Sequence, residues 1–133
     1  MRSRRILFVV FAVVASVLST VAAGAIIGPA NDDAANAAEI DSFPYRMTQS
    51  NEGATSEDGE YTICNTPGDE TVWYTFTATS SEALFYSATA DDWYPYVWVF
   101  KGEPGADPGD LTPVNPCGDY WNIIQTVPGT TYY

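Results

Sequence analysis

The sequence predicts an all-β domain, and more specifically a β-sandwich of the jelly-roll type. Two observations carry this prediction. Segments such as 71–79 alternate between two sets of side chains with a period of two residues, which is typical of half-buried strands. The loops between such segments are rich in Pro and Gly, which interrupt regular structure every few residues. Short strands separated by turn-rich loops favour a sandwich or jelly roll.

Residues 1–25 are typical of a secretory signal peptide. The arginines of "MRSRR" precede the apolar run Ile6–Leu18, and Ala23–Ala25 has the small-x-small form of a cleavage site. The run is shorter than the roughly 18 to 20 residues of a spanning helix, so a retained membrane anchor is the weaker alternative. "SRR" also resembles a twin-arginine export signal. We therefore expect a chain that is secreted or held at the cell surface.

The charge balance excludes several kinds of partner. The whole chain has a formal net charge of −12, and without residues 1–25 only Arg46 and Lys101 oppose seventeen acidic residues. Nucleic acid and anionic membrane surfaces require a basic protein surface, so neither is an expected partner after signal cleavage. The carboxylates either solvate the surface in a saline medium or, in part, hold a cation.

The mature chain is expected to contain a polar leader, 26–38, and one domain, 39–133. All four Trp and nine Tyr lie in this mature part, so a core can form despite the charge. In an exported chain, Cys64 and Cys117 are expected to form a disulfide. Closing a loop of about 54 residues would stabilise the fold by about 4 kcal/mol in the chain-entropy model.

Residue patterns place the individual elements. A short helix is conceivable over Asp32–Ile40, with Asn31 as its N-cap. Segment 71–79 predicts a strand, and 83–90 is expected to be its hairpin partner. Segment 94–102 predicts a third strand, with Pro95 confined to its start.

The second half of the chain begins with irregular segments. Segments 102–110 and 112–119 contain Pro and Gly every few residues, so no regular structure is expected there. Segment 122–127 predicts a further strand, and 128–133 predicts a turn that leads into the last one. The acidic segment 50–60 is expected to be an exposed loop.

The order of several motifs resembles the bacterial pre-peptidase C-terminal (PPC) domain. In sequence order these are "NDDAANAAEI", "GATSEDGE", "TVWYTFTA", "ADDWYPYVWVFKG", "LTPVNPCGD" and "VPGTTYY". The resemblance covers roughly residues 31–133, and "VWYTF" and "GTTYY" are its most specific parts. It implies a jelly-roll sandwich that accompanies secreted hydrolases or surface proteins. Such domains are non-catalytic; they bind carbohydrate, protein or calcium, or serve secretion and maturation.

The same resemblance implies a possible calcium site. Calcium-binding relatives use the segment that corresponds to Asn31, Asp32 and Asp33, so these three are the candidate ligands. Calcium takes six to eight oxygen ligands, so other loops would have to supply the remainder. The family's Asp-aromatic-Asp turn falls on 92–94, where Tyr94 replaces the second carboxylate. Asp91 and Asp92 are therefore more simply explained as turn residues that accept backbone hydrogen bonds.

The resemblance also bears on the end of the sequence. Relatives continue after the position of Tyr133 with residues that complete the final strand. A sandwich that lacks part of this strand is expected to expose an unpaired edge. Either the sequence is a fragment of a longer protein, or another chain donates the strand.

The stretch "YPYVWVF" is the strongest candidate for a ligand platform. Alternation along a strand puts Val97 and Val99 on one face and Tyr96 and Trp98 on the other. In relatives the positions that match the two valines carry core side chains, so the resemblance implies that Tyr96 and Trp98 point outward. Outward rings form a flat apolar surface for a sugar or a protein partner. The alternative is that a loop, such as the Pro-rich segment after Gly102, covers them. Two further tryptophans, at positions 73 and 121, are expected to be packing residues.

Catalysis is not expected in this chain. It has no His, its one Lys is Lys101, and no Ser lies in a GxSxG motif. A pair of carboxylates could hydrolyse glycosides, but no pair stands out among the seventeen acidic residues. The sequence therefore predicts a non-catalytic extracellular module that binds carbohydrate or a surface protein. The alternative is a structural or maturation domain of a longer secreted hydrolase.

Overall fold

A computed structural model describes residues 27–60, 70–91, 95–114 and 120–133. The predicted signal peptide, the predicted disulfide between Cys64 and Cys117, and the turn at 92–94 lie outside the described residues. Among the described residues, no helix has both the length and the apolar character needed to cross a membrane.

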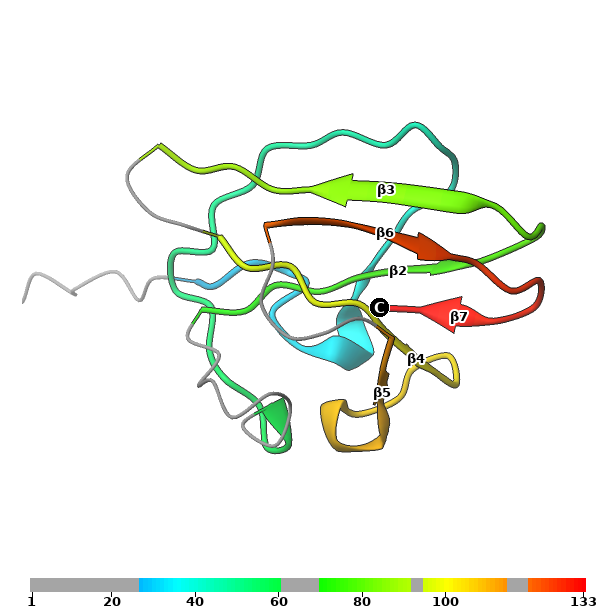
Figure 1. Ribbon diagram of the computed structural model, residues 1–133. Coiled ribbons are helices and arrows are strands. Elements are labelled where there is room, and N and C mark those ends of the chain that lie inside the picture. Colours follow the sequence, from blue (N-terminus) through cyan, green and yellow to red (C-terminus); the bar gives the residue numbers. More distant parts are fainter. Residues whose placement is uncertain (1–26, 61–69, 92–94, 115–119) are drawn as a thin grey trace, which may run out of the picture.

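The described residues form two β-sheets, and the prediction of an all-β chain is confirmed (Figure 1). The five-stranded sheet has the order β1-β2-β7-β4-β5, with bounds Ala38–Glu39, Tyr74–Thr77, Thr131–Tyr132, Phe100–Gly102 and Thr112–Pro113. The two-stranded sheet pairs β3 (Ala83–Ser87) with β6 (Trp121–Gln125). Only β1 and β2 run parallel; every other described pair is antiparallel.

The helix predicted over 32–40 is wrong. Only one 3-10 turn forms, η1 (Ala34–Asn36), and the chain then extends into β1. The Ala38 N–H donates to the Trp73 carbonyl at 2.9 Å, and Ile40 makes the next such bond with Thr75 at 2.8 Å. A helix of one or two turns has little stability of its own, so pairing with β2 outweighs it.

The last strand, β7, lies in the middle of the larger sheet. It pairs with β2 on one side and with β4 on the other. Phe100 and Tyr133 exchange two backbone hydrogen bonds of 3.0 Å each. The strands predicted at 71–79 and 128–133 are therefore confirmed, and residues 131–133 do not form an unpaired edge.

The predicted hairpin between 71–79 and 83–90 is wrong, because β3 pairs with β6 instead. The reason is a set of bonds made by the buried hydroxyl of Thr126. This hydroxyl accepts from the Glu82 N–H at 2.9 Å and lies 2.9 Å from the Ser80 carbonyl, to which it can donate. These contacts lead the chain out of the first sheet and into the second.

A hydrophobic core, here called the inner core, forms between the two sheets. Tyr132 comes from β7, Val99 directly precedes β4, Ile124 comes from β6, and Ala78 follows β2. Leu84 and Tyr86 of β3 pack against them. The prediction that Val99 is a core residue is confirmed, whereas Val97 is only half-buried.

A second cluster, here called the outer core, packs on Phe100 and Trp73. Its buried members are Ala34, Trp73, Phe100, Leu111 and Tyr133. Val99 belongs to the inner core, and side chains alternate between the faces of a strand, so Phe100 faces the opposite side. Loops rather than a third sheet supply the cover, through Ala34 of η1 and the segment 106–111. The larger sheet is thus buried on both faces, which explains the alternation of rings and valines in "YVWVF".

The Pro-rich segments contain more regular structure than predicted. Pro108 begins a 3-10 turn, η3 (Pro108–Asp110), because its fixed φ suits the start of a helical turn. Pro113 lies in β5, at the sheet edge, where a missing N–H is tolerated. Gly59 approaches η3 so closely that a Cβ would lie 2.6 Å from the Gly109 nitrogen. This approach brings the acidic loop 50–60 against η3.

Candidate functional site

The two members of the predicted platform differ in burial. Tyr96 is 56% exposed, whereas Trp98 is partly buried and packs against the outer core. The two rings lie nearly parallel, with centroids 6.1 Å apart. The indole nitrogen of Trp98 is buried and has no hydrogen-bond partner within the described ranges. The alternative of a covering loop therefore holds for Trp98, because Ala106 and Leu111 of the Pro-rich segment belong to the same cluster.

A larger apolar surface lies on the outer side of the two-stranded sheet. Phe85 of β3 is 59% exposed, and on β6 Ile123 is 58% and Trp121 47% exposed. Phe85 pairs directly with Ile123 in the strand register, and the rings of Phe85 and Trp121 lie 6.5 Å apart at 34°. We call these three side chains the aromatic face. The prediction that Trp121 is a packing residue is wrong.

Strand alternation builds the aromatic face. On β3, Leu84 and Tyr86 point into the inner core, so Phe85 between them points outward. On β6, Ile124 is buried, so its neighbours Ile123 and Gln125 are exposed. Both sides of each strand carry apolar residues, and the pattern alone does not say which side is covered. The sequence does contain one signal for the aromatic face. Besides the core residues, the strands of the smaller sheet carry a second set of large apolar side chains, Phe85, Trp121 and Ile123.

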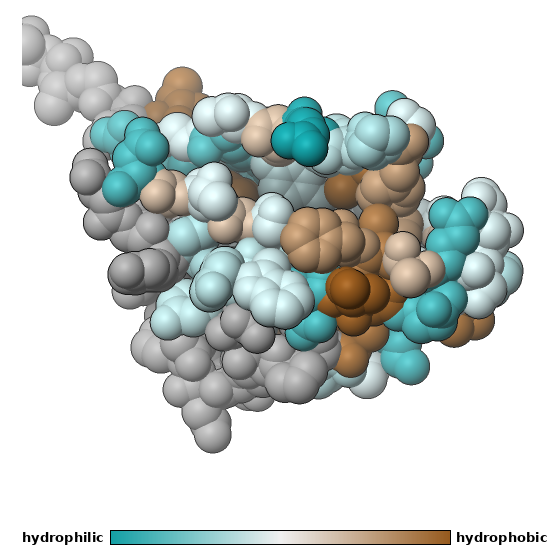
Figure 2. Space-filling model, turned by 45° about the horizontal axis from the view of Figure 1, so that its top comes forward, coloured by the Kyte–Doolittle hydropathy of each residue, from teal (hydrophilic) through white to brown (hydrophobic). Residues whose placement is uncertain are grey.

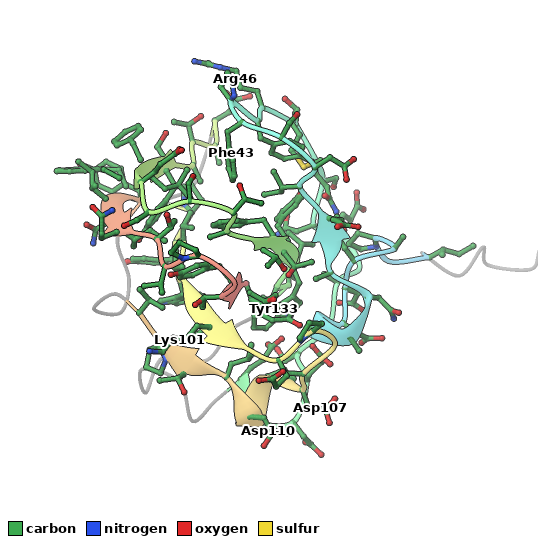
Figure 3. All side chains as sticks on the ribbon, turned by 90° about the vertical axis from the view of Figure 1, so that its right-hand side faces the viewer. Phe43, Arg46, Lys101, Asp107, Asp110 and Tyr133 are labelled. Atoms are coloured by element: carbon green, nitrogen blue, oxygen red, sulfur yellow. The ribbon has the colours of Figure 1, made fainter. Side chains whose placement is uncertain are left out.

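The aromatic face carries no charge of its own. Neither 83–90 nor 120–133 contains a charged residue, in a chain with seventeen acidic ones. Figure 2, which turns this side toward the reader, shows hydrophobic residues at the centre with hydrophilic ones around them. Asp107 and Asp110 lie at the opposite end of the molecule (Figures 1 and 3). The face is therefore a neutral surface on an acidic protein.

Polar groups border the aromatic face. The Gln125 amide donates to the Ser81 hydroxyl at 3.2 Å, and both residues are exposed. Ser87 at the other end of β3 is also exposed. Flat rings with amide and hydroxyl groups at the border can stack on an apolar ligand face and bond to its polar edge.

The three calcium candidates all form hydrogen bonds with other protein groups. Asn31 is 5% exposed, donates its side-chain amide to the Trp73 carbonyl at 2.7 Å and accepts from Gln49. Both carboxylate oxygens of Asp32 accept from Thr55, at 2.6 Å and 3.0 Å. Asp33 accepts from the Asn36 amide at 3.2 Å. The side-chain oxygens of Asn31 and Asp32 thus bind protein donors; calcium binding stays a prediction.

The loop 50–60 is anchored rather than simply exposed. Glu57 accepts from the Ala34 N–H at 2.6 Å, and the buried Glu60 accepts from the Trp73 indole at 3.2 Å. Burial raises the pKa of both carboxyls, and the nearby carboxylates of Asp33 and Asp107 add to this at Glu57. Within the described ranges, no three or more Asp, Glu, Cys or His side chains form a group that could hold a metal.

These two carboxyls predict a stability that rises as the pH falls from neutrality. Each pKa is raised above the ordinary value of 4.5, so the folded state binds protons more tightly than the unfolded state. The free energy of unfolding should therefore decrease as the pH rises above about 4.5. In thermal melts, Glu60→Gln should raise Tm at neutral pH and flatten its pH dependence. Glu52→Gln, at an exposed position of the same loop, should leave the profile unchanged; equal profiles for both variants would contradict the prediction.

Comparison of the chain with protein-family models, curated proteins and solved structures finds no match in any of the three. The resemblance to the PPC domain therefore stays a prediction that rests on the quoted motifs.

Proposed function

We propose that this chain is a secreted, non-catalytic recognition module that binds an uncharged polysaccharide through the aromatic face. We further propose that its two sheets belong to a β-sandwich of the jelly-roll type. The observation that carries the function is the group of three exposed apolar side chains, Phe85, Trp121 and Ile123, on one neutral sheet surface.

The chemistry of sugars fits this surface. A pyranose ring presents C–H groups on its faces and hydroxyls around its edge, so it stacks on aromatic rings and bonds to polar groups at their border. Phe85 and Trp121 supply the rings, while Gln125, Ser81 and Ser87 supply hydroxyl and amide groups. Because the rings stand on paired strands, little conformational entropy is lost when a ligand binds.

The absence of charge from both strands favours a neutral ligand. An anionic polysaccharide would approach a chain with a net charge of −12 against repulsion. A basic ligand would be drawn to the acidic surfaces around Asp107 and Asp110 instead. A neutral polymer such as chitin, cellulose or xylan is neither repelled by the net charge nor drawn to the acidic surfaces.

The experiment is retention of the purified chain on insoluble chitin, cellulose, xylan, peptidoglycan and collagen. We expect retention on one of the uncharged polysaccharides, and Trp121→Ala should weaken it by at least about tenfold, as for a central interface ring. Tyr96→Ala is the matched control, because this ring is exposed to a similar degree but lies outside the aromatic face. Circular dichroism should show that both variants keep the fold.

The main competing function is a structural or maturation domain of a longer secreted hydrolase. It predicts that the folded chain is retained on none of the five polymers. Retention that Tyr96→Ala loses and Trp121→Ala keeps would instead favour the platform predicted from the sequence.

A further inference from the structure

We propose that two copies of this chain associate through the free edge of β3, so that two two-stranded sheets join into one four-stranded sheet. The joined sheet would have the strand order β6-β3-β3-β6, with the first two strands from one copy and the last two from the other. The pairing of the two copies does not depend on the proposed ligand.

Along the outer edge of β3, a row of backbone groups bonds to no residue of the described ranges. The bonds from Ala88 to Tyr120 and from Thr126 to Glu82 fix which β3 residues face β6. By alternation, Ala83, Phe85 and Ser87 direct their N–H and C=O groups to the opposite side. No described residue bonds to these groups. Figure 1 shows β3 as the outer strand of its sheet, with the exposed segment 41–48 passing above it.

This edge is complementary to itself. If two β3 strands pair antiparallel about a two-fold axis through Phe85, Phe85 faces its own copy, and Ala83 faces Ser87 of the second copy. These are the residues whose backbone groups point to the edge, so each facing pair exchanges two hydrogen bonds. The pairing satisfies three N–H and three C=O groups of each chain, and it is isologous, as a two-fold dimer requires.

The other described sheet edges are protected, whereas this one is not. β1 and β5 are two residues long; β1 carries exposed Glu39, and β5 carries Pro113. On β6, the Asn122 side chain accepts from the Ile123 N–H at 2.7 Å and so takes the central outward N–H of that edge. β3 has five residues and contains no Pro and no charged residue. Proline, charge and shortness are the usual devices against edge pairing.

Charge also selects this edge for contact between two copies. Two chains that each carry a net charge of −12 repel one another over most of their surfaces. β3 and β6 contain no charged residue, so two copies can approach there without opposed carboxylates. At the centre of the pairing, the two Phe85 rings would meet on the exposed face, and aromatic cross-strand pairs add stability.

The consequence for ligand binding rests on the proposed function. Pairing at β3 places two aromatic faces side by side on one continuous sheet. A polymer could then contact both copies, and the second contact would be intramolecular, which raises the overall affinity without a new kind of contact.

The test compares two charge substitutions on the same exposed face. Phe85→Glu places two carboxylates directly opposite each other across the proposed axis and should weaken association by about a hundredfold or more, because opposed like charges cost several kcal/mol. Ile123→Glu adds the same charge on β6, where the two copies would be roughly 14 Å apart across three strand spacings. This distance exceeds the screening length of about 8 Å, so association should persist.

Sedimentation equilibrium measures the association, and a denaturing gel without reductant excludes a covalent dimer. We expect twice the chain mass for the unsubstituted chain and for Ile123→Glu, and the single chain mass for Phe85→Glu. A monomeric unsubstituted chain, a dimer that survives Phe85→Glu, or loss of the dimer in both variants would overturn the proposal. Polymer retention is scored separately: both substitutions disrupt the aromatic face, so the proposed function predicts that both lose retention whatever the oligomeric state.

Discussion

Asn31→Asp is expected to destabilise the fold severely, by about 3 kcal/mol or more. The native side chain is buried and donates to the Trp73 carbonyl at 2.7 Å. Aspartate has the same shape but cannot donate when ionised, so it would place a buried negative charge against a carbonyl oxygen. Removing one partner of a buried polar contact and leaving a charge uncompensated is among the costliest single changes.

Thermal unfolding with calcium and with a chelator distinguishes this role from metal binding. If residue 31 were mainly a calcium ligand, an additional carboxylate would preserve or strengthen the site. We expect instead that Tm falls in both conditions. Asp33→Asn is the control, because Asp33 is exposed and should change stability by no more than about 0.5 kcal/mol. An unchanged Tm for Asn31→Asp, together with a Tm that calcium raises, would support the calcium interpretation.

Phe100→Ala is expected to cost about 3 to 5 kcal/mol, which approaches the total stability of a small domain. Phe100 is buried in the outer core, with its ring 6.0 Å from that of Trp73. The lost ring would leave a cavity beneath η1 and the segment 106–111, whose loops cannot easily close it. Chemical denaturation measures the change.

Tyr96→Ala is the matched control for this substitution, because it removes a ring from the same side of the same stretch. The ring of Tyr96 is mostly exposed, so its loss should change stability by no more than about 0.5 kcal/mol. If the two substitutions lowered the free energy of unfolding by similar amounts, the stretch 96–100 would not have one exposed and one buried end, and the account would be contradicted.

The sequence predicted strands where the pattern was local. The alternation in 71–79 and the strand and turn residues of 122–127 and 128–133 led to β2, β6 and β7, because such local patterns need no knowledge of the partner strand. The pairing of β3 was missed for a non-local reason. A buried hydroxyl at Thr126, forty-four residues from Glu82, binds the loop that was expected to close a hairpin.

The candidate site shows a second limit of pattern analysis. The strand predicted at 94–102 forms only at its end, as β4, but alternation correctly put Trp98 and Phe100 on one side of this stretch and Val99 on the other. It could not show that loops from distant parts of the chain cover Trp98, or that the Trp121 side chain stays 47% exposed. Where both sides of a strand are apolar, burial is decided by which segments pack over each side, and only the fold contains that information.

The central claim is that the aromatic face contacts a neutral polysaccharide, and nuclear magnetic resonance of the tryptophan indole groups tests it most directly. The indole signals are assigned with Trp121→Phe and Trp73→Phe and followed while soluble chito-, cello- and xylo-oligosaccharides are added. We expect one of these sugars to shift the Trp121 signal in a saturable manner, while the buried Trp73 signal stays in place. If no sugar shifts the Trp121 signal, or if binding moves only the other indole signals, the aromatic face is not the binding site.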